Sequence, residues 1–168
     1  MRGLLRTVTA FLAVLLSLAC AGSATPKRAR RAPAAVPVQT LLQQGIPGQA
    51  GDQLREVVKD DASWRALWAK LREGSSLPEQ PPAVDFRHEM AIVAAMPTQS
   101  CVSKVTVRSV QKVRGELVVT VLEEPPAPNC VCVVSQRPIH AVRLQRLPEP
   151  VRFVTERGQT SCGGRSGR

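Results

Sequence analysis

The residues with the greatest potential for chemistry in this chain of 168 residues are its cysteines. Cys20 lies near the N-terminus, and the other four lie in the second half of the chain: Cys101, Cys130, Cys132 and Cys162. A thiolate can act as a nucleophile or a metal ligand, and two thiols can form a disulfide. The compartment decides among these uses, because structural disulfides persist mainly in oxidising environments.

The first 19 residues have the features of a secretory signal peptide. Arg2 and Arg6 supply a basic start, and an apolar run follows over residues 8–19. That run is too short to cross a bilayer as a helix, which requires roughly 20 residues. We therefore expect the protein to be exported.

The end of this segment resembles the processing site of a bacterial lipoprotein. Ala19 and Cys20 match the pattern, although Ser17 stands where leucine is usual. The pattern predicts that Cys20 becomes an acylated N-terminus, with Ala21 favouring an outer-membrane lipoprotein. Several acyl chains would form a durable membrane anchor, at about 0.8 kcal/mol for each buried CH₂. The alternative is ordinary cleavage at the A-x-A pattern of residues 19–21, which gives a periplasmic or cell-surface protein.

Export leaves an even number of cysteines for disulfides in the mature domain. Four cysteines permit three pairings, and the sequence does not choose among them. Cys130 and Cys132 are two residues apart on a predicted strand, so they point to the same face and should not bond each other. We expect Cys101 to pair with one of them, and Cys162 to hold the C-terminal tail through the other.

Soft-metal binding is the alternative use of these thiols. Cys101, Cys130 and Cys132, together with the thioether of Met96, are ligands that suit Cu(I) or zinc. Their spacing differs from the C-x₂-C of structural zinc sites, and two disulfides would consume every thiol. Disulfides are therefore the preferred interpretation, and no cofactor or metal is expected.

The sequence contains no catalytic motif of the G-x-S-x-G, H-E-x-x-H, P-loop or dinucleotide-binding type. His140 shares a strand face with Val142 and Leu144, which predicts a core or edge position, and His88 lies in a charged, exposed segment. A nucleophilic pair of Cys101 and His140 would need a free thiol, which export disfavours. We expect the protein not to be an enzyme.

Short β-rich runs bounded by glycine and proline dominate the chain after residue 36, and they predict antiparallel strands. Met90–Met96 is apolar at every position, as expected of a strand covered on both faces. The alternation within residues 102–113 slips near Arg108–Ser109, which predicts a β-bulge. The other predicted strands are residues 36–42, 53–59, 117–122, 130–134, 139–144 and 151–154, with a break at 45–48, a turn at 114–115 and a proline-rich loop at 124–129.

One helix is predicted between Asp60 or Asp61, which can cap its start, and Gly74, which ends it. Its apolar side chains recur at i, i+3, i+4 and i+7 and form one stripe. The stripe consists of Trp64, Leu67, Trp68 and Leu71. Two tryptophans could form a ligand-stacking face, but this spacing is more typical of a helix docked on a sheet.

These elements predict an α+β fold, in which a mainly antiparallel sheet (curved, or a small sandwich or barrel) carries one amphipathic helix. The domain is expected to span residues 36–154. Residues 20–35 should form a disordered basic tether, and residues 155–168 a flexible tail.

Much of the formal net charge of +10 lies towards the two ends of the chain, at Lys27, Arg28, Arg30, Arg31, Arg157, Arg165 and Arg168. Such basic arms can bind an anionic envelope polymer or the headgroups of a membrane. Nucleic acid is not an expected partner, because the protein is exported and has no aromatic platform among its basic residues.

The order of several segments resembles the PrcB C-terminal domain family, and the resemblance covers about residues 57–154. The segments are the Trp64–Trp68 helix, Asp85–Phe86, Met90–Met96, Leu117–Val119 and Gln136–Val142. That family is named after a lipoprotein subunit of a bacterial surface protease complex. Where the family has a Pro-Thr-Gly-Gly-Tyr turn, this chain has Pro97–Cys101, so we expect a disulfide to provide the anchoring there.

The resemblance implies a non-catalytic accessory module. We therefore expect an exported, lipid-anchored interaction module of the bacterial cell envelope, with a protein partner such as an envelope or surface protease. Binding of a soft metal, or of an anionic envelope polymer through the basic arms, are the alternatives. The loops at residues 75–82 and 124–129 are the candidate contact surfaces, because loops carry recognition more often than cores do.

Overall fold

The computed structural model describes residues 33–47 and 50–162. The predicted signal peptide, Cys20, the basic tether up to residue 32 and residues 163–168 lie outside the described residues. Within the described part, the elements are β1 (Ala34–Val36), β2 (Gln39–Pro47), β3 (Leu54–Val58), α1 (Asp61–Arg72), β4 (Glu89–Ala95), β5 (Gln99–Ser100), β6 (Lys104–Val113), β7 (Glu116–Glu124), β8 (Ser135–Gln145) and β9 (Val151–Arg157).

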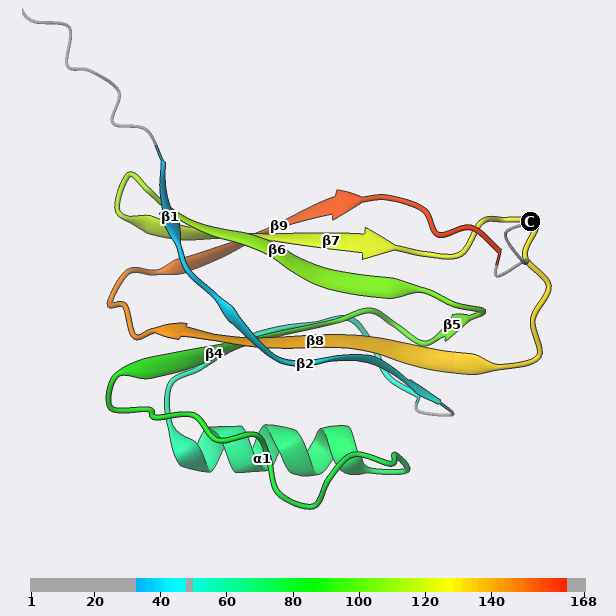
Figure 1. The fold of residues 1–168 in the computed structure, drawn as a ribbon, viewed down its shortest axis with the longest axis horizontal. Coiled ribbons are helices and arrows are strands. Elements are labelled where there is room, and N and C mark those ends of the chain that lie inside the picture. Colours follow the sequence, from blue (N-terminus) through cyan, green and yellow to red (C-terminus); the bar gives the residue numbers. More distant parts are fainter. Residues whose placement is uncertain (1–32, 48–49, 163–168) are drawn as a thin grey trace, which may run out of the picture. The chain divides into compact units, whose positions relative to one another are not determined.

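The strands form two sheets, and the predicted α+β class is confirmed (Figure 1). The first sheet has the strand order β1-β6-β7-β9. The second has the order β2-β8-β4-β3, with the short β5 also paired to β8. The two sheets pack face to face as a small sandwich, and α1 covers the outer face of the second sheet. β1 and β2 are nearly continuous, so one stretch of chain serves both sheets.

Helix α1 is held by its predicted tryptophan stripe. Asp60 caps its start by accepting a hydrogen bond from the Ser63 backbone N–H at 2.8 Å. Trp64 and Trp68 are 1% and 2% exposed, with their rings 5.6 Å apart. Their indole N–H groups donate to the carbonyl oxygens of Pro82 and Pro78, each at 2.9 Å. The predicted contact loop at residues 75–82 therefore also closes the core over these rings.

β4 is buried on both faces, as its uninterrupted apolar sequence predicts. Ala91 and Val93 pack in the cluster beneath α1, whereas Met90 and Ile92 pack between the two sheets. Successive side chains of a strand point to opposite faces, so a strand with cover on both sides needs no polar residue.

The predicted bulge and turn of the β6–β7 hairpin are both present. The register of β6 against β7 shifts between Val107 and Ser109, which leaves Arg108 unpaired. At the turn, Arg114 and Gly115 have φ angles of 52° and 87°. Left-handed backbone at both central residues matches the twist of two-residue hairpins, and glycine adopts it without a steric penalty.

The predicted strand at residues 130–134 is wrong. These residues form a loop before β8, and Val131 and Val133 are fully exposed. Valine prefers strands because its side chain packs well on the face of a sheet, and among the described residues no strand pairs with this segment. The predicted break at residues 45–48 also comes too early, because β2 continues through Gly45 to Pro47.

The predicted flexible tail is wrong for residues 155–162. β9 extends to Arg157, and the Gly158 and Thr160 N–H groups donate to the carbonyl oxygens of Glu123 and Pro125 at 2.8 and 2.9 Å. β9 also runs parallel to β7, unlike the other strand pairs in the described residues. The chain crosses from the second sheet to the first between β8 and β9, and this crossing permits the parallel direction.

Candidate functional site

Two disulfides consume all four cysteines of the domain. Cys101 bonds Cys132 and Cys130 bonds Cys162, with Cα atoms 5.0 and 5.2 Å apart. The predicted scheme, in which Cys101 and Cys162 each take one member of the C-x-C pair, is confirmed, and the structure selects the partners. These bonds indicate that the domain matures in an oxidising environment, outside the cytoplasm.

The soft-metal alternative loses its ligands for the same reason. Each of the proposed thiols of Cys101, Cys130 and Cys132 is in a disulfide. Among the described residues, no group of three or more His, Cys, Asp or Glu side chains is arranged to hold a metal ion.

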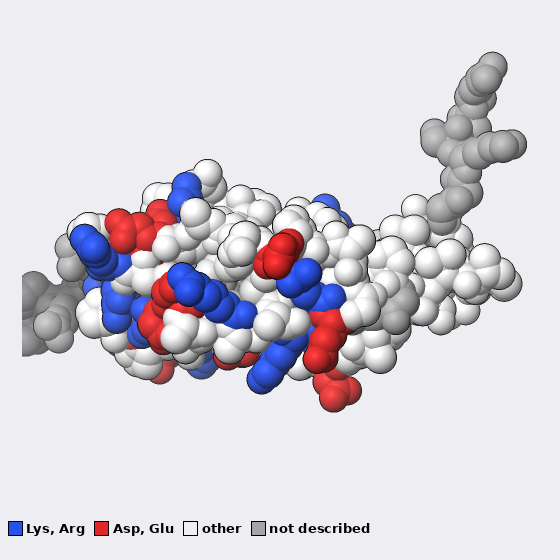
Figure 2. Space-filling view, turned by 90° about the horizontal axis from the view of Figure 1, so that it is seen from below, with Lys and Arg blue, Asp and Glu red and all other residues white. Residues whose placement is uncertain are grey.

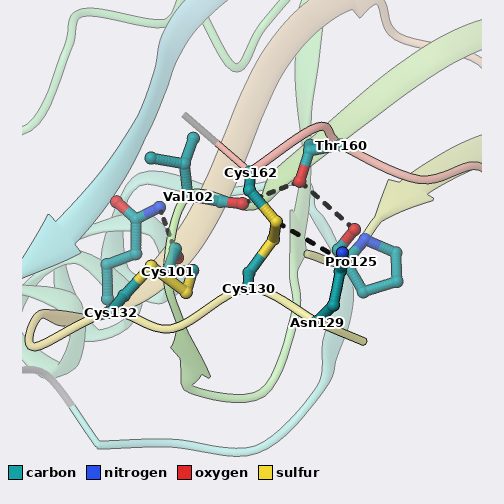
Figure 3. The surroundings of a disulfide bond; sticks show 9 residues. Cys101, Val102, Pro125, Asn129, Cys130, Cys132, Thr160 and Cys162 are labelled. Atoms are coloured by element: carbon teal, nitrogen blue, oxygen red, sulfur yellow. Dashed lines mark hydrogen bonds between the residues drawn. A yellow bond between two sulfur atoms is a disulfide. The ribbon is translucent and has the colours of Figure 1, made fainter. Parts of the chain in front are cut away.

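The disulfides brace one loop, residues 125–134, which we call the cystine loop (Figure 3). One bond ties it to the segment before β6 and the other to the segment after β9. The Thr160 hydroxyl donates to the Val102 carbonyl oxygen at 2.8 Å and lies 3.3 Å from the Pro125 carbonyl oxygen. Asn129 Oδ1 lies 3.7 Å from Cys162 Sγ. Because this sulfur is in a disulfide, it carries no hydrogen to donate, and the approach is a van der Waals contact.

Cys101 has a left-handed backbone, with φ at 69°. Its N–H donates to the Val134 carbonyl oxygen at 3.0 Å, at the entry of β8. A non-glycine residue rarely adopts this conformation. This turn therefore has a positive φ at a cysteine that a disulfide and a hydrogen bond hold in place.

The cystine loop and the segment that Cys101 joins to it carry exposed valines, which we call the valine patch. Its members are Val102, Val131, Val133 and Val134, which are 61%, 97%, 101% and 58% exposed. Residues 125–134 contain no charged side chain. In the view of Figure 2, charges of both signs are mixed over the helix face, whereas little charge is seen on this side of the end that carries the cystine loop in Figure 1.

This arrangement is suited to binding. Valine is stiff at χ1 and gives up little rotamer freedom when it is buried, and a braced loop gives up little backbone freedom. Pre-organised apolar surface of this kind lowers the free-energy cost of association. Sequence reasoning chose the neighbouring residues 124–129 as a contact surface and missed the valines, because it assigned them to a strand.

A cleft adjoins the valine patch, with Val102 belonging to both. It has a volume of about 310 Å³ and lies between the start of β6 and the strands β2 and β8. Its lining includes Gln43, Ser103, Lys104 and Gln136. The volume is at the lower end of the range of ligand sites.

A second depression, of about 440 Å³, lies beside the start of α1. Arg146 crosses it and donates to the carbonyl oxygens of Lys59 and Phe86 at 3.1 and 2.6 Å. Asp85 accepts from His88 and from the Arg87 N–H, and these hydrogen bonds hold the pKa of its carboxyl below the ordinary value. These groups are occupied with one another and fasten the segment before β4.

His140 is buried and makes two hydrogen bonds, as its predicted core position requires. Its Nδ1 accepts from the Val107 N–H at 2.7 Å, so Nε2 carries the proton and donates to the Thr40 hydroxyl at 3.1 Å. Burial and, to a lesser degree, the charge of Lys104 lower its pKa to about 4. Since Cys101 is in a disulfide, the two do not form a thiol–imidazole pair.

Sequence reasoning also missed a buried ion pair. Arg55 of β3 bonds Glu123 of β7 and so links the two sheets, and the Gln53 amide donates to Glu123 at 2.6 Å. Glu123 occupies an inward position of β7 in phase with Leu117, Val119 and Val121. A carboxylate in phase with apolar residues was the signal that could have revealed it.

Comparison of this chain with protein-family models, with curated proteins and with solved structures found no match. The resemblance to the PrcB C-terminal domain family therefore stays a prediction. In the part of the chain that the structure describes, no helix has the length and apolar character needed to cross a membrane.

Proposed function

We propose that this protein is an exported, lipid-anchored accessory module of the bacterial cell envelope that binds a partner protein and catalyses no reaction. The observation that carries the proposal is the valine patch, an uncharged apolar surface on a doubly cross-linked loop. Isolated exposed valines are common, but three on one braced loop, with a fourth beside the cysteine that is bonded to that loop, are typical of an interaction site.

The remaining parts of the proposal rest on sequence. The signal peptide and the lipoprotein-like pattern at Cys20 support anchoring, and Ala21 supports the outer membrane over the inner. The resemblance to the PrcB C-terminal domain family suggests an envelope or surface protease as the class of partner.

Crosslinking in living cells tests this function. A photoreactive amino acid at position 131 or 133 should capture a discrete envelope protein, and the same probe at Arg65, whose side chain is 71% exposed on α1, should not. Adducts from Arg65 equal to those from the patch, or no adducts from the patch, would contradict the proposal.

The charge distribution favours a second candidate function, the binding of an anionic envelope polymer. All 13 acidic residues lie in the described domain, beside 15 of the 23 basic residues. Of the remaining eight, Arg2 and Arg6 are in the signal peptide, and the mature arms hold Lys27, Arg28, Arg30, Arg31, Arg165 and Arg168. Only a protein that retains these arms should bind vesicles rich in anionic phospholipid, and the affinity should fall steeply with salt.

A further inference from the structure

β6 has an open edge over its first half. β1 pairs with β6 only from Val110 to Lys112, and in the described part of the chain no other strand pairs with β6 on that side, although β8 and β2 of the second sheet lie close to it. We call residues 103–107 on this side the open edge. An unpaired strand edge presents a row of backbone donors and acceptors that can pair with another chain.

Side chains of the second sheet take the place of the missing strand. The Gln136 amide donates to the carbonyl oxygens of Cys101 and Ser103, and the Gln43 amide donates to that of Val105. At the bulge, His140 accepts from the Val107 N–H. These backbone groups belong to alternate residues, as the groups along one edge of a strand do.

The hydrogen bonds that these side chains make to the open edge differ in length from one end of the edge to the other. The bonds of Gln43 and His140 are 3.1 and 2.7 Å long, within the normal range. Those of Gln136 to Cys101 and Ser103 are 3.3 and 3.5 Å long, at the limit of a hydrogen bond. The part of the edge next to the cystine loop is therefore the weakly satisfied part.

The cleft of about 310 Å³ lies at this weakly satisfied part. The Ser103 hydroxyl is buried there without a hydrogen-bond partner among the described residues. By the same alternation, the N–H groups of Ser103 and Val105 face this side. Gln136 reaches the edge only because residue 45 is glycine: a Cβ there would lie 1.9 Å from Gln136 Oε1.

We propose that the open edge receives an extended polypeptide segment of the partner, which adds a strand to the first sheet in line with β1 and displaces the Gln136 amide. This inference rests on the proposed function and names its binding mode, in which main-chain hydrogen bonds supply affinity beside the valine patch. Val102 belongs to the valine patch and also lines the cleft at the open edge, so one partner segment can contact both surfaces. The row of main-chain groups selects a polypeptide, because neither lipid nor an anionic polymer can continue a strand ladder.

A defined peptide tests the mode of binding. The probe is a blocked, labelled peptide of alternating threonine and valine, and the control carries N-methyl groups on its four central residues. We expect the probe to bind and to slow hydrogen exchange at the Ser103 and Val105 amides, and the N-methylated control to do neither. No binding, or slowed exchange at β9 with none at the open edge, would overturn the proposal.

Variants of the edge sharpen this test. Ser103→Pro removes the N–H at the edge and should weaken probe binding by at least about tenfold. Ser103→Ala keeps that N–H, so its loss should be clearly smaller. Gln136→Ala removes the competing amide and should strengthen binding several-fold. Melting curves and disulfide content show whether each variant is folded, and a folded Ser103→Pro protein with wild-type affinity would contradict the proposal.

The failures of the two proposals are distinguishable. If crosslinks from positions 131 and 133 persist while the peptide does not bind, strand addition is wrong and the valine patch still binds a partner. If the peptide binds at the open edge but the patch captures no envelope protein, the edge accepts a strand and the proposed function is wrong.

Discussion

The tryptophan stripe and the valine patch are both apolar, yet they are ordered by different forces. Trp64 and Trp68 lie between α1 and the second sheet, with their indole N–H groups bonded to a covering loop. Val131 and Val133 cover nothing and are covered by nothing among the described residues. The backbone that carries them is fixed by two disulfides.

This difference separates the region that stabilises the fold from the surface that we propose for recognition. Apolar burial supplies the free energy of folding beneath α1, where each indole removes a large area from water. At the cystine loop, covalent bonds supply the order, so apolar side chains remain free to contact a partner. Substitutions in the two regions should therefore have opposite consequences, and the following predictions take the largest effect first.

Trp68→Ala should have the largest effect. The side chain is 2% exposed, and its removal leaves a cavity in the core beneath α1, so the free energy of unfolding should fall by about 3–5 kcal/mol. Urea unfolding measures this change. A variant that unfolds at the same urea concentration as wild type would show that the stripe is not core.

Removal of Cys130–Cys162, by replacing both cysteines with serine, should have the next largest effect. The bond joins residues 32 apart, and a crosslink of that span stabilises by about 3–4 kcal/mol, mainly through the unfolded chain. Urea unfolding measures the loss, and protease cleavage after Arg157 should accelerate. The control is the double variant that replaces Cys101 and Cys132 with serine, because that disulfide joins residues 31 apart and so closes a loop of nearly the same length. Unchanged stability of both variants would contradict the view that covalent bonds order the cystine loop.

The pH dependence of stability tests the contact between the two sheets at His140. Its pKa in the folded protein is about 4, below the ordinary value of 6.5 for histidine, so folding favours the neutral ring. This stability is fully present above pH 6.5 and is lost as the pH falls through about 4, by up to about 3 kcal/mol. Urea unfolding at pH 7 and pH 4 measures it.

His140→Asn is the control for that experiment. Asp60, Asp85 and Glu149 have pKa values lowered by their hydrogen bonds, so they also withdraw stability as the pH falls. The difference between the wild-type and His140→Asn profiles isolates the imidazole. Identical profiles would show that His140 is not held as a neutral ring.

Val131→Ser combined with Val133→Ser should have the smallest effect on folding. Both side chains are fully exposed, so the free energy of unfolding should change by less than about 0.5 kcal/mol. Urea unfolding against wild type measures this. A loss of several kcal/mol would mean that the valines are buried by part of the protein itself.

Periodicity and local chemistry predicted much of this fold. The capping aspartates and Gly74 predicted the ends of α1, and its apolar stripe predicted the buried face. The apolar sequence of β4 predicted a strand that is covered on both faces. The slipped alternation at Arg108–Ser109 revealed the bulge. The exclusion of a Cys130–Cys132 bond gave the correct scheme of pairing, although it assumed a strand that is not there.

What sequence reasoning missed depends on contacts between distant segments. Val131 and Val133 are residues of the type found in strands, but only the fold shows that no strand of the described chain pairs with them. Glu123, Gln43 and Gln136 are ordinary polar residues in the sequence, and their partners come close only when the two sheets pack together. β9 is parallel because its connection crosses between sheets, which no local pattern records.

The most direct test of the central claim is the affinity of the crosslinked envelope protein, once purified, for wild type and for the Val131→Ser, Val133→Ser double variant. Isothermal titration calorimetry should show binding weakened by at least about tenfold, with the stability of the domain unchanged. Equal affinity for the two proteins would contradict the account, because the exposed valines would then take no part in recognition.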